Sequence, residues 1–512
     1  MNLIFFLSFK GCRFEWILYR VSYFMVKKSL ACLVLIFAVL VHSSPVKETE
    51  RYNLKSLNAS PMLWEFHRIT SSNANQKYMY PQRDSAWRRN AVELEHNALL
   101  RYSSDRAFLA TSIVGGIDYR GGETLGDTIW PGVDGGLYLR GFVDSLEFVL
   151  DARIYAEGHS AVRPQSYDGE YMDFQSGDNN DGLEYLSYAR YRGHMALNMG
   201  FARLDLGRDV VHWGPGFYNN LTLNQFSLPF NMATLEVVVG PLTVMSLYGD
   251  LRIYKGNVTE KNKEARNLYG HRYELNLGDL VFGVSELQVV YDDSNPWLLL
   301  PIVPLFMEKG NFTESGNNGS LSFDINYRLL NMVRFYSEFF LDDMQSPISL
   351  IENDNVQAKW AWMIGSHFSK NVFLRKHMVE AGSLVEYARV EPYVYSHFKE
   401  NTAQFAHLEV PLGNQGGPNS QTVDWLAYAR VDGRLTLGLR HRWFWKGTDY
   451  GSALNDTTPN NHVNVPKKFL FGADMKYSLT PSIGYEGNFF SFVTEWTFFD
   501  DRKIYSRLGL KW

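Results

Sequence analysis

Several carboxylates in this chain have a spacing that could support chemistry. Glu338, Asp342 and Asp343 lie within one short stretch, and Glu386 and Glu391 follow further along. Two carboxylates flanking a glycosidic bond can act as acid and as base or nucleophile. The alternative is that Asp342 and Asp343 form a solvated strand end or a cation site. The odd spacing of Glu386 and Glu391 places them on opposite faces of a regular strand, which argues against a shared catalytic site.

Other catalytic arrangements have little support in the sequence. Histidines such as His212 and His271 have no helical i, i+4 partner and no cysteine with which to bind zinc. No serine has the Gly-x-Ser-x-Gly context of an esterase. Cys12 precedes residues 25–43 and Cys32 lies within them, and this segment is the expected signal peptide described below. The mature chain should therefore contain no cysteine, so disulfides and cysteine nucleophiles are not expected. We expect no enzyme activity, no cofactor and no metal.

The sequence supports sugar binding better than it supports catalysis, because it contains suitable aromatic side chains and arginines. Our candidates for carbohydrate contact are Arg208, Trp213, Tyr218 and Trp297, because aromatic faces stack on sugar CH groups and arginine donates hydrogen bonds. Each is equally consistent with loop packing or with an aromatic girdle. The 34 Phe, 30 Tyr and 13 Trp would supply two such girdles at membrane interfaces, although a large soluble β-protein could use them too.

The elements that position these residues have the period of β-strands. In 145–157, apolar residues such as Leu150 and Ile154 alternate with charged residues such as Asp151 and Arg153. Segments 321–330, 332–341 and 434–446 alternate in the same way. Strands that face lipid on one side and a polar interior on the other show this pattern. The sequence therefore predicts an all-β fold, a transmembrane antiparallel β-barrel of about 16–18 strands.

The N-terminal and C-terminal segments of the chain are both typical of an exported outer-membrane barrel. Residues 25–43 begin with Met25 and two lysines, continue with an apolar stretch and end in small residues, which is the order of a cleavable signal peptide. We therefore divide the chain into an upstream extension and signal peptide (1–43), a partly helical periplasmic segment (44–106) with a helix near 84–100, and the barrel (107–512). The final amphipathic strand ends on Trp512 and resembles the recognition signal of outer-membrane barrels.

One segment carries most of the motif information. In LDLGRDVVHWGPGFYNNLTLNQFSLPF, residues 204–230, Gly214, Pro215 and Gly216 force a tight excursion directly after a strand. Gly207 allows close approach of backbones, and Arg208 and Asp209 point to opposite sides of the strand, so only one of them can face the lumen.

This segment resembles the Gly-Arg…Trp-Gly-Pro-Gly signature of the capsule-assembly Wzi family through Gly207, Arg208, Trp213, Gly214, Pro215 and Gly216. RFYSEFFLDDMQSP (334–347) and VEYARVEPYVYSH (385–397) are further matches, and they contain Glu338, Asp342, Asp343, Glu386 and Glu391. The resemblance extends from about residue 105 to 512. It implies an outer-membrane barrel of about 18 strands with a periplasmic helical part, acting as a lectin for capsular polysaccharide.

The leading hypothesis is a non-enzymatic protein in the outer membrane of a Gram-negative bacterium that binds surface or capsular polysaccharide and supports capsule assembly or attachment. The alternatives are a porin-like channel and, with less support, an outer-membrane hydrolase. The expected partners are the polysaccharide, outer-membrane lipid and the outer-membrane assembly machinery. Nucleic acid is not expected, because the net charge is −5 and the 50 basic residues are scattered along the chain.

Overall fold

The computed structural model describes thirteen ranges of the chain, namely 98–122, 129–158, 174–178, 184–254, 263–291, 295–305, 317–329, 332–343, 358–397, 403–456, 467–487, 489–500 and 502–511. The predicted signal peptide, nearly all of the predicted periplasmic segment and Trp512 lie outside these ranges. Of the helix expected near 84–100, only residues 98–100 are described. They are not helical, and Leu100 is already the first residue of the short strand β1 (Leu100–Ser103).

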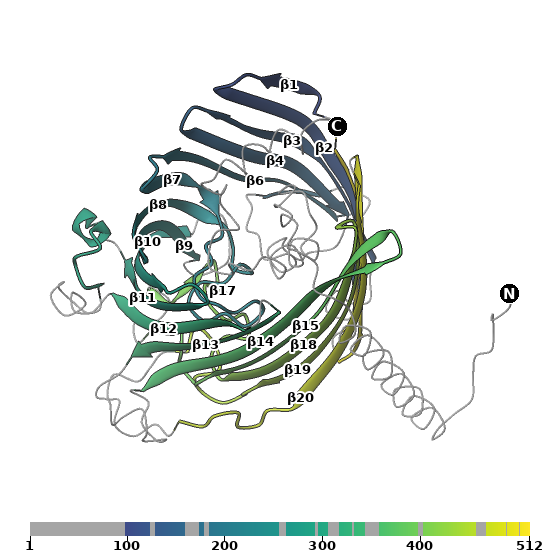
Figure 1. Ribbon diagram of the computed structural model, residues 1–512. Coiled ribbons are helices and arrows are strands. Elements are labelled where there is room, and N and C mark those ends of the chain that lie inside the picture. The colour runs from purple at the N-terminus through teal and green to yellow at the C-terminus, as the bar shows by residue number, and fades with distance from the viewer. Residues whose placement is uncertain are drawn as a thin grey trace, which may run out of the picture.

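Eighteen antiparallel strands form one closed barrel (Figure 1). In chain order they are β2 (Ala107–Gly122), β3 (Ile129–Val143), β4 (Leu146–Gly158), β6 (Glu184–Asn198), β7 (Ala202–Asp209), β8 (Phe230–Val239), β9 (Leu242–Tyr254), β10 (Lys263–Asn276), β11 (Leu280–Tyr291), β12 (Asn318–Leu329), β13 (Val333–Asp343), β14 (Lys359–Leu374), β15 (His377–Val390), β18 (Ser420–Val431), β19 (Leu435–Lys446), β20 (Met475–Glu486), β21 (Phe490–Phe499) and β22 (Lys503–Lys511). The predicted fold class is confirmed.

The last strand closes the sheet on the first. β22 pairs with β2 from Val114↔Lys511 to Gly122↔Lys503, and each remaining strand pairs with its neighbour in the chain. β1 and β5 (Phe174–Asp178) are short additions to the sheet, and β16 (Ala406–His407) and β17 (Val410–Pro411) form a separate pair. The described part of the chain contains no helix of the length and apolarity that a membrane crossing requires.

The two faces of the barrel differ as the alternation predicts. On β4, Ile154 is 66% exposed on the outer face, whereas Asp151 and Arg153 are buried on the inner face. On β19, Leu437 is exposed and its neighbour Thr436 is buried. At these positions the outer side chains are apolar and the inner ones polar, which is the arrangement of a barrel embedded in lipid.

The two ends of the barrel also differ. At one end the strands are joined by two or three residues, for example at Asp144–Ser145 and Pro241, and β2 begins and β22 ends there. At the other end most connections are long, including 210–229, 292–317, 391–419 and 447–474. Transmembrane barrels place short turns in the periplasm and long loops outside, which assigns the long connections to the cell exterior.

Candidate functional site

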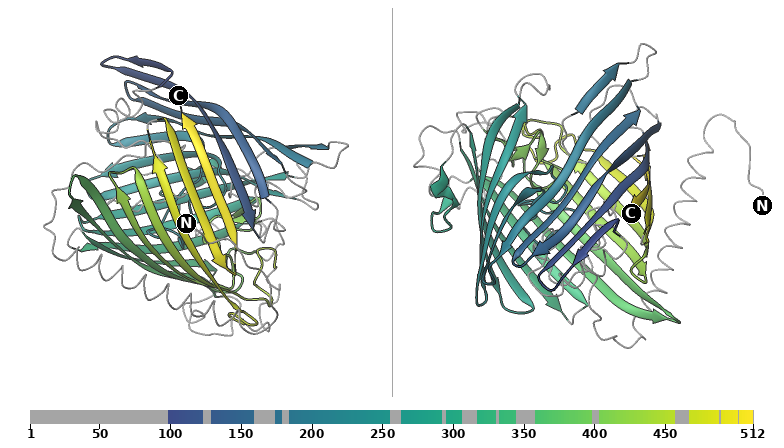
Figure 2. Two further views of the ribbon diagram at one scale, coloured as in Figure 1. Left: turned by 90° about the vertical axis from the view of Figure 1, so that its right-hand side faces the viewer. Right: turned by 90° about the horizontal axis from the view of Figure 1, so that it is seen from above.

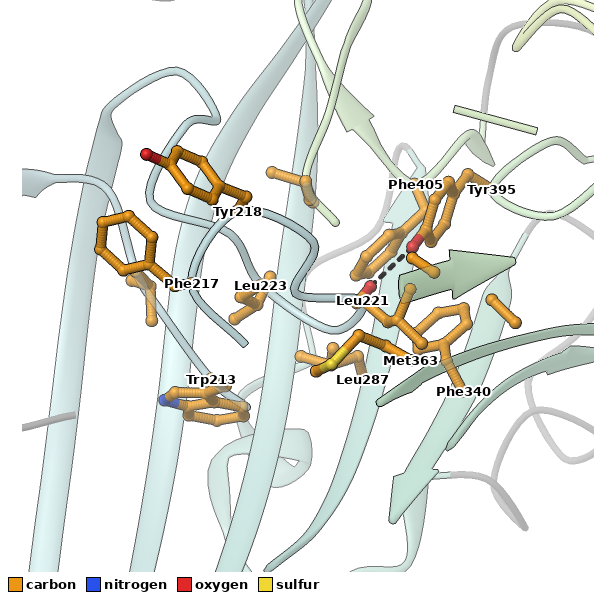
Figure 3. Packing of buried hydrophobic residues seen from close by; sticks show 14 of the residues in the cluster. Trp213, Phe217, Tyr218, Leu221, Leu223, Leu287, Phe340, Met363, Tyr395 and Phe405 are labelled. Carbon is orange, nitrogen blue, oxygen red and sulfur yellow. Dashed lines mark hydrogen bonds between the residues drawn. The ribbon is translucent and has the colours of Figure 1, made fainter. Parts of the chain in front are cut away.

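The connection 210–229 does not project from the barrel. It leaves β7 at Asp209 and returns to β8 at Phe230, and its residues are almost all buried. Figure 3 labels five of its side chains, namely Trp213, Phe217, Tyr218, Leu221 and Leu223. Trp213 and Leu223 form an isolated antiparallel bridge within it, with N···O distances of 3.0 and 3.2 Å. We call residues 210–229 the inner loop.

A tight turn gives the inner loop its shape. Gly214 has a φ of 122°, and a Cβ atom there would lie 2.3 Å from the Asn220 side chain, so only glycine fits. The Asn220 amide accepts a hydrogen bond from the Gly216 N–H at 3.0 Å and donates to the carbonyls of Trp213 and Leu223. The Trp-Gly-Pro-Gly motif is therefore folded around Asn220.

Two wall carboxylates hold the inner loop in place. The Glu386 carboxylate on β15 accepts the backbone N–H groups of Phe217, Tyr218 and Asn219, at 2.5, 2.9 and 3.0 Å. The Glu338 carboxylate on β13 accepts the N–H groups of Leu221 and Thr222, both at 2.8 Å. Two wall side chains therefore satisfy five backbone N–H groups of a buried loop.

Further wall side chains contact the inner loop at Pro215 and Tyr218. Arg334 donates to the Pro215 carbonyl, and the Tyr336 hydroxyl donates to Glu386 at 2.7 Å. On β19 the Arg440 guanidinium lies 3.6 Å from the centre of the Tyr218 ring and donates to Asp424 at 2.9 Å. Contacts from three separate strands fix the position of one loop.

A second segment, residues 391–397 and 403–419, packs against the inner loop. Its Tyr395 hydroxyl donates to the Leu221 carbonyl at 2.8 Å and accepts the Asn414 N–H. Burial raises the pKa of that hydroxyl well above its usual value, so it stays protonated and able to donate. Asp342 in turn accepts the Tyr395 N–H at 2.9 Å.

The two segments share a hydrophobic cluster with the wall (Figure 3). Its labelled members are Trp213, Phe217, Tyr218, Leu221, Leu223, Leu287, Phe340, Met363, Tyr395 and Phe405. Trp213 packs on β10, where a Cβ added to Gly270 would lie 2.9 Å from its ring. Since packed apolar side chains exclude water, this part of the lumen is filled with protein.

The other two carbohydrate candidates, Arg208 and Trp297, lie apart from this cluster. Arg208 is on the outer face of β7, with its guanidinium 5.2 Å from the centre of the Tyr191 ring, while Asp209 is the inward residue of that pair. Trp297 is 69% exposed in the connection between β11 and β12. Of the four carbohydrate candidates the structure brings together Trp213 and Tyr218, and both are buried.

The carboxylates in the motifs that resemble the Wzi family form hydrogen bonds and ion pairs within the protein. Glu338 and Glu386 are fully buried beneath the inner loop, so neither faces an open cleft. Glu391, just beyond β15, accepts a hydrogen bond from Arg389 at 2.7 Å and lies 3.1 Å from the Lys467 ammonium, whose pKa is lowered by burial. The Asp343 side chain lies outside the described residues. The described residues contain no cluster of three or more His, Cys, Asp or Glu that could hold a metal.

The opposite half of the lumen is lined by ion pairs. Arg507 contacts Asp118 at 3.2 Å and also contacts Asp134, which lies 3.1 Å from Arg153. A second set joins buried side chains of β4, β6 and β7, namely Glu147, His194, Arg203, Asp205 and Asp209. We call this the charged half of the lumen. The other half is filled mainly by the apolar cluster of the loops, although ion pairs such as Arg272–Asp324 also lie on its wall.

No protein-family model and no curated protein matches the chain, so the Wzi resemblance of its motifs stays an expectation. Among solved structures the chain is similar to Wzi, an Escherichia coli outer membrane protein involved in group 1 capsule assembly and described as a carbohydrate-binding β-barrel. The two share 14% identity and a TM-score of 0.49 over 78% of this chain and 84% of that one.

The chain is also similar to Acinetobacter baumannii OccAB3, with 11% identity and a TM-score of 0.41 over 80% of this chain and 98% of that one. For Pseudomonas aeruginosa OccK8 (OprE) the values are 10% and 0.41 over 79% and 97%. Such low identities assign no ligand to this chain. By its own closure and apolar outer face, the chain is a β-barrel of the outer-membrane type.

Proposed function

We propose that this chain is a non-enzymatic protein of a Gram-negative outer membrane that binds surface or capsular polysaccharide and supports its assembly or attachment. The observation that carries the proposal is the apolar cluster that the inner loop and the segment 391–419 build inside the barrel. A wide pore needs a water-filled cross-section, whereas packed loops favour a binding protein. The choice of polysaccharide as ligand rests on the motifs that resemble the Wzi family.

The anchoring of the inner loop suits this role. A loop that Glu338 and Glu386 already hold in one conformation loses little conformational entropy when a ligand binds. A polysaccharide offers the same unit many times, so weak contacts from many copies of the protein add up through avidity. Outer-membrane lipid and the assembly machinery would be further partners, because a barrel with an apolar outer face has to be inserted into a bilayer.

A porin-like channel is the second candidate. The charged half of the lumen supports it, because Arg507, Arg153 and their aspartates would line a hydrophilic path. The hydrolase alternative has weaker support, because a glycosidase needs two carboxylates that can reach substrate. Glu338 and Glu386 instead accept backbone N–H groups beneath the inner loop.

A deletion strain tests the proposal in the bacterium that encodes the chain. We expect the strain to release polysaccharide into the medium while total synthesis continues, because an outer-surface binder acts after polymerisation and export. Cell-bound and free polysaccharide should be measured in wild-type, deletion and complemented strains. If the deletion strain retains as much cell-bound polymer as wild type, the attachment role is rejected.

A further inference from the structure

A short apolar segment lies on the outside of the barrel. Residues 295–305, which we call the outer flap, belong to the connection between β11 and β12 and include the 3₁₀ helix η3 (Pro296–Leu299). The flap lies outside the ring of strands beside β10 and β11 (Figure 1), and a second view agrees (Figure 2). Its sequence, NPWLLLPIVPL, has no charged residue.

The wall beneath the outer flap is polar although it faces outward. On β10, Leu268 and Arg272 face the lumen, so Tyr269 and His271 between them face out. The residues paired with His271 on the neighbouring strands are Ser246 and Glu286, which share its face. His271 is fully buried and Ser246 is 5% exposed, because the flap covers them.

Four hydrogen bonds join the outer flap to this wall. The Glu286 carboxylate accepts the Leu305 N–H at 2.8 Å, and the Tyr269 hydroxyl accepts the Asn295 N–H at 3.1 Å. Ser246 and Tyr273 donate to the carbonyls of Leu299 and Pro301. Backbone groups at membrane depth have to be satisfied by protein groups, and these four bonds satisfy part of the flap's backbone.

The strand register places the flap at the level of the lipid-facing belt. Ser246 pairs with Leu235, and Leu235 pairs with Leu204, both exposed apolar residues of the outer face. His271 lies five residues above the end of β10 at Asn276, or about 13 Å on a strand tilted by roughly 40°. That is near the middle of an apolar belt about 25 Å tall.

We propose that the outer flap is embedded in the bilayer, where its outward side chains contact lipid acyl chains and its backbone shields a polar strip of the wall. The outward residues are all apolar, with Ile302 85%, Trp297 69% and Leu300 40% exposed. They continue the belt formed on neighbouring strands by Phe282 and Phe323. Trp297 is then a lipid contact and not a sugar contact.

The absence of charge on the flap favours acyl chains over other occupants. A site for an anionic polymer needs cations or hydrogen-bond donors at its surface, and the outward side chains of the flap offer only the Trp297 indole N–H. An exposed Ile302 in water would be unfavourable, whereas contact with lipid removes the same area from water. Contact of the flap with lipid does not depend on which ligand the barrel binds.

Site-directed fluorescence tests this placement. Ile302→Cys should be labelled with an environment-sensitive fluorophore in full-length barrel reconstituted in liposomes, with no other reactive cysteine present. We expect quenching by nitroxide-bearing acyl chains several-fold stronger than by aqueous iodide. Leu437→Cys on the outer face of β19 is the lipid-exposed control. Tyr450→Cys, 77% exposed and next to the Asp449–Lys468 ion pair, is the aqueous control.

The two controls define the outcomes. If the label at position 302 behaves like the label at 437, the flap is in lipid. If iodide quenches it as strongly as the label at 450, the flap faces water or serves a soluble partner, and the inference is overturned. Trp297→Cys repeats the measurement at a second position, and heat-modifiable mobility confirms that each labelled barrel is folded. Because the readout is local, failure of the polysaccharide proposal would leave the result unchanged.

Discussion

Glu386→Ala should free the inner loop from the wall and open the lumen. Three backbone N–H groups and the Tyr336 hydroxyl would lose their acceptor in a buried site. Each unsatisfied buried donor costs about 1–3 kcal/mol, so four donors would cost about 4–12 kcal/mol before water enters and relaxes the site. The loop should then leave the wall and admit water to the space it fills.

Two measurements detect the release of the inner loop. Heat-modifiable mobility should show unfolding at a lower temperature, and planar-bilayer recordings should show openings that the wild-type protein lacks. Val385→Ala is the matched control, because it shortens the adjacent residue on the lipid-facing side of the same strand. An unchanged current and unfolding temperature in Glu386→Ala would show that the carboxylate does not hold the loop.

Arg272→Met should destabilise the barrel by about 3–5 kcal/mol, because it leaves buried carboxylates without their cation. The Arg272 guanidinium is fully buried and makes paired bonds to Asp324, at 2.6 and 3.1 Å, and one to Glu274 at 2.9 Å. Glu274 and Asp324 therefore both depend on this one arginine.

Thermal unfolding in detergent measures this effect. Adding Asp324→Asn to Arg272→Met should recover part of the stability, because it removes one uncompensated charge. Arg106→Met is the control, since its ion pair with Asp144 is exposed and such pairs contribute little. Equal unfolding temperatures for Arg272→Met and Arg106→Met would refute the buried-charge argument.

The barrel could be predicted from the sequence because alternation is a local property. Leu150 and Ile154 face outward and Asp151 and Arg153 inward, as their positions in the strand require. The C-terminal strand agrees as well, with Leu508 and Leu510 exposed outside and Arg507 buried inside. A membrane barrel imposes this pattern on every strand, so even short segments carry it.

The arrangement of the site depends on contacts that no local pattern encodes. The motif glycines predicted a tight turn, but the sequence could not show that the turn folds inward to meet Glu386, 169 residues from Phe217. Asn220, Arg334, Tyr395 and Arg440 were missed for the same reason. The long gap between β7 and β8 was the available signal, because structureless connections of that length are often functional.

The two carbohydrate candidates outside the inner loop, Trp297 and Arg208, show a second limit of sequence-based prediction. An exposed tryptophan next to proline looks the same in sequence whether it contacts sugar, packs in a loop or faces lipid. The hydrogen bonds from β9, β10 and β11 to the outer flap locate the flap that carries Trp297 on the outside of the barrel. The direction of Arg208 followed from strand parity once Asp209 was known to be the inward residue.

The most direct test of the central proposal combines binding and conductance on one purified sample. Barrel in detergent should be titrated with surface polysaccharide extracted from the bacterium that encodes it, and the same preparation recorded in planar bilayers. The proposal predicts saturable binding of the polymer and little steady current, because the inner loop and the segment 391–419 fill part of the lumen. No detectable binding together with a large, stable current would contradict it and would identify the protein as a channel.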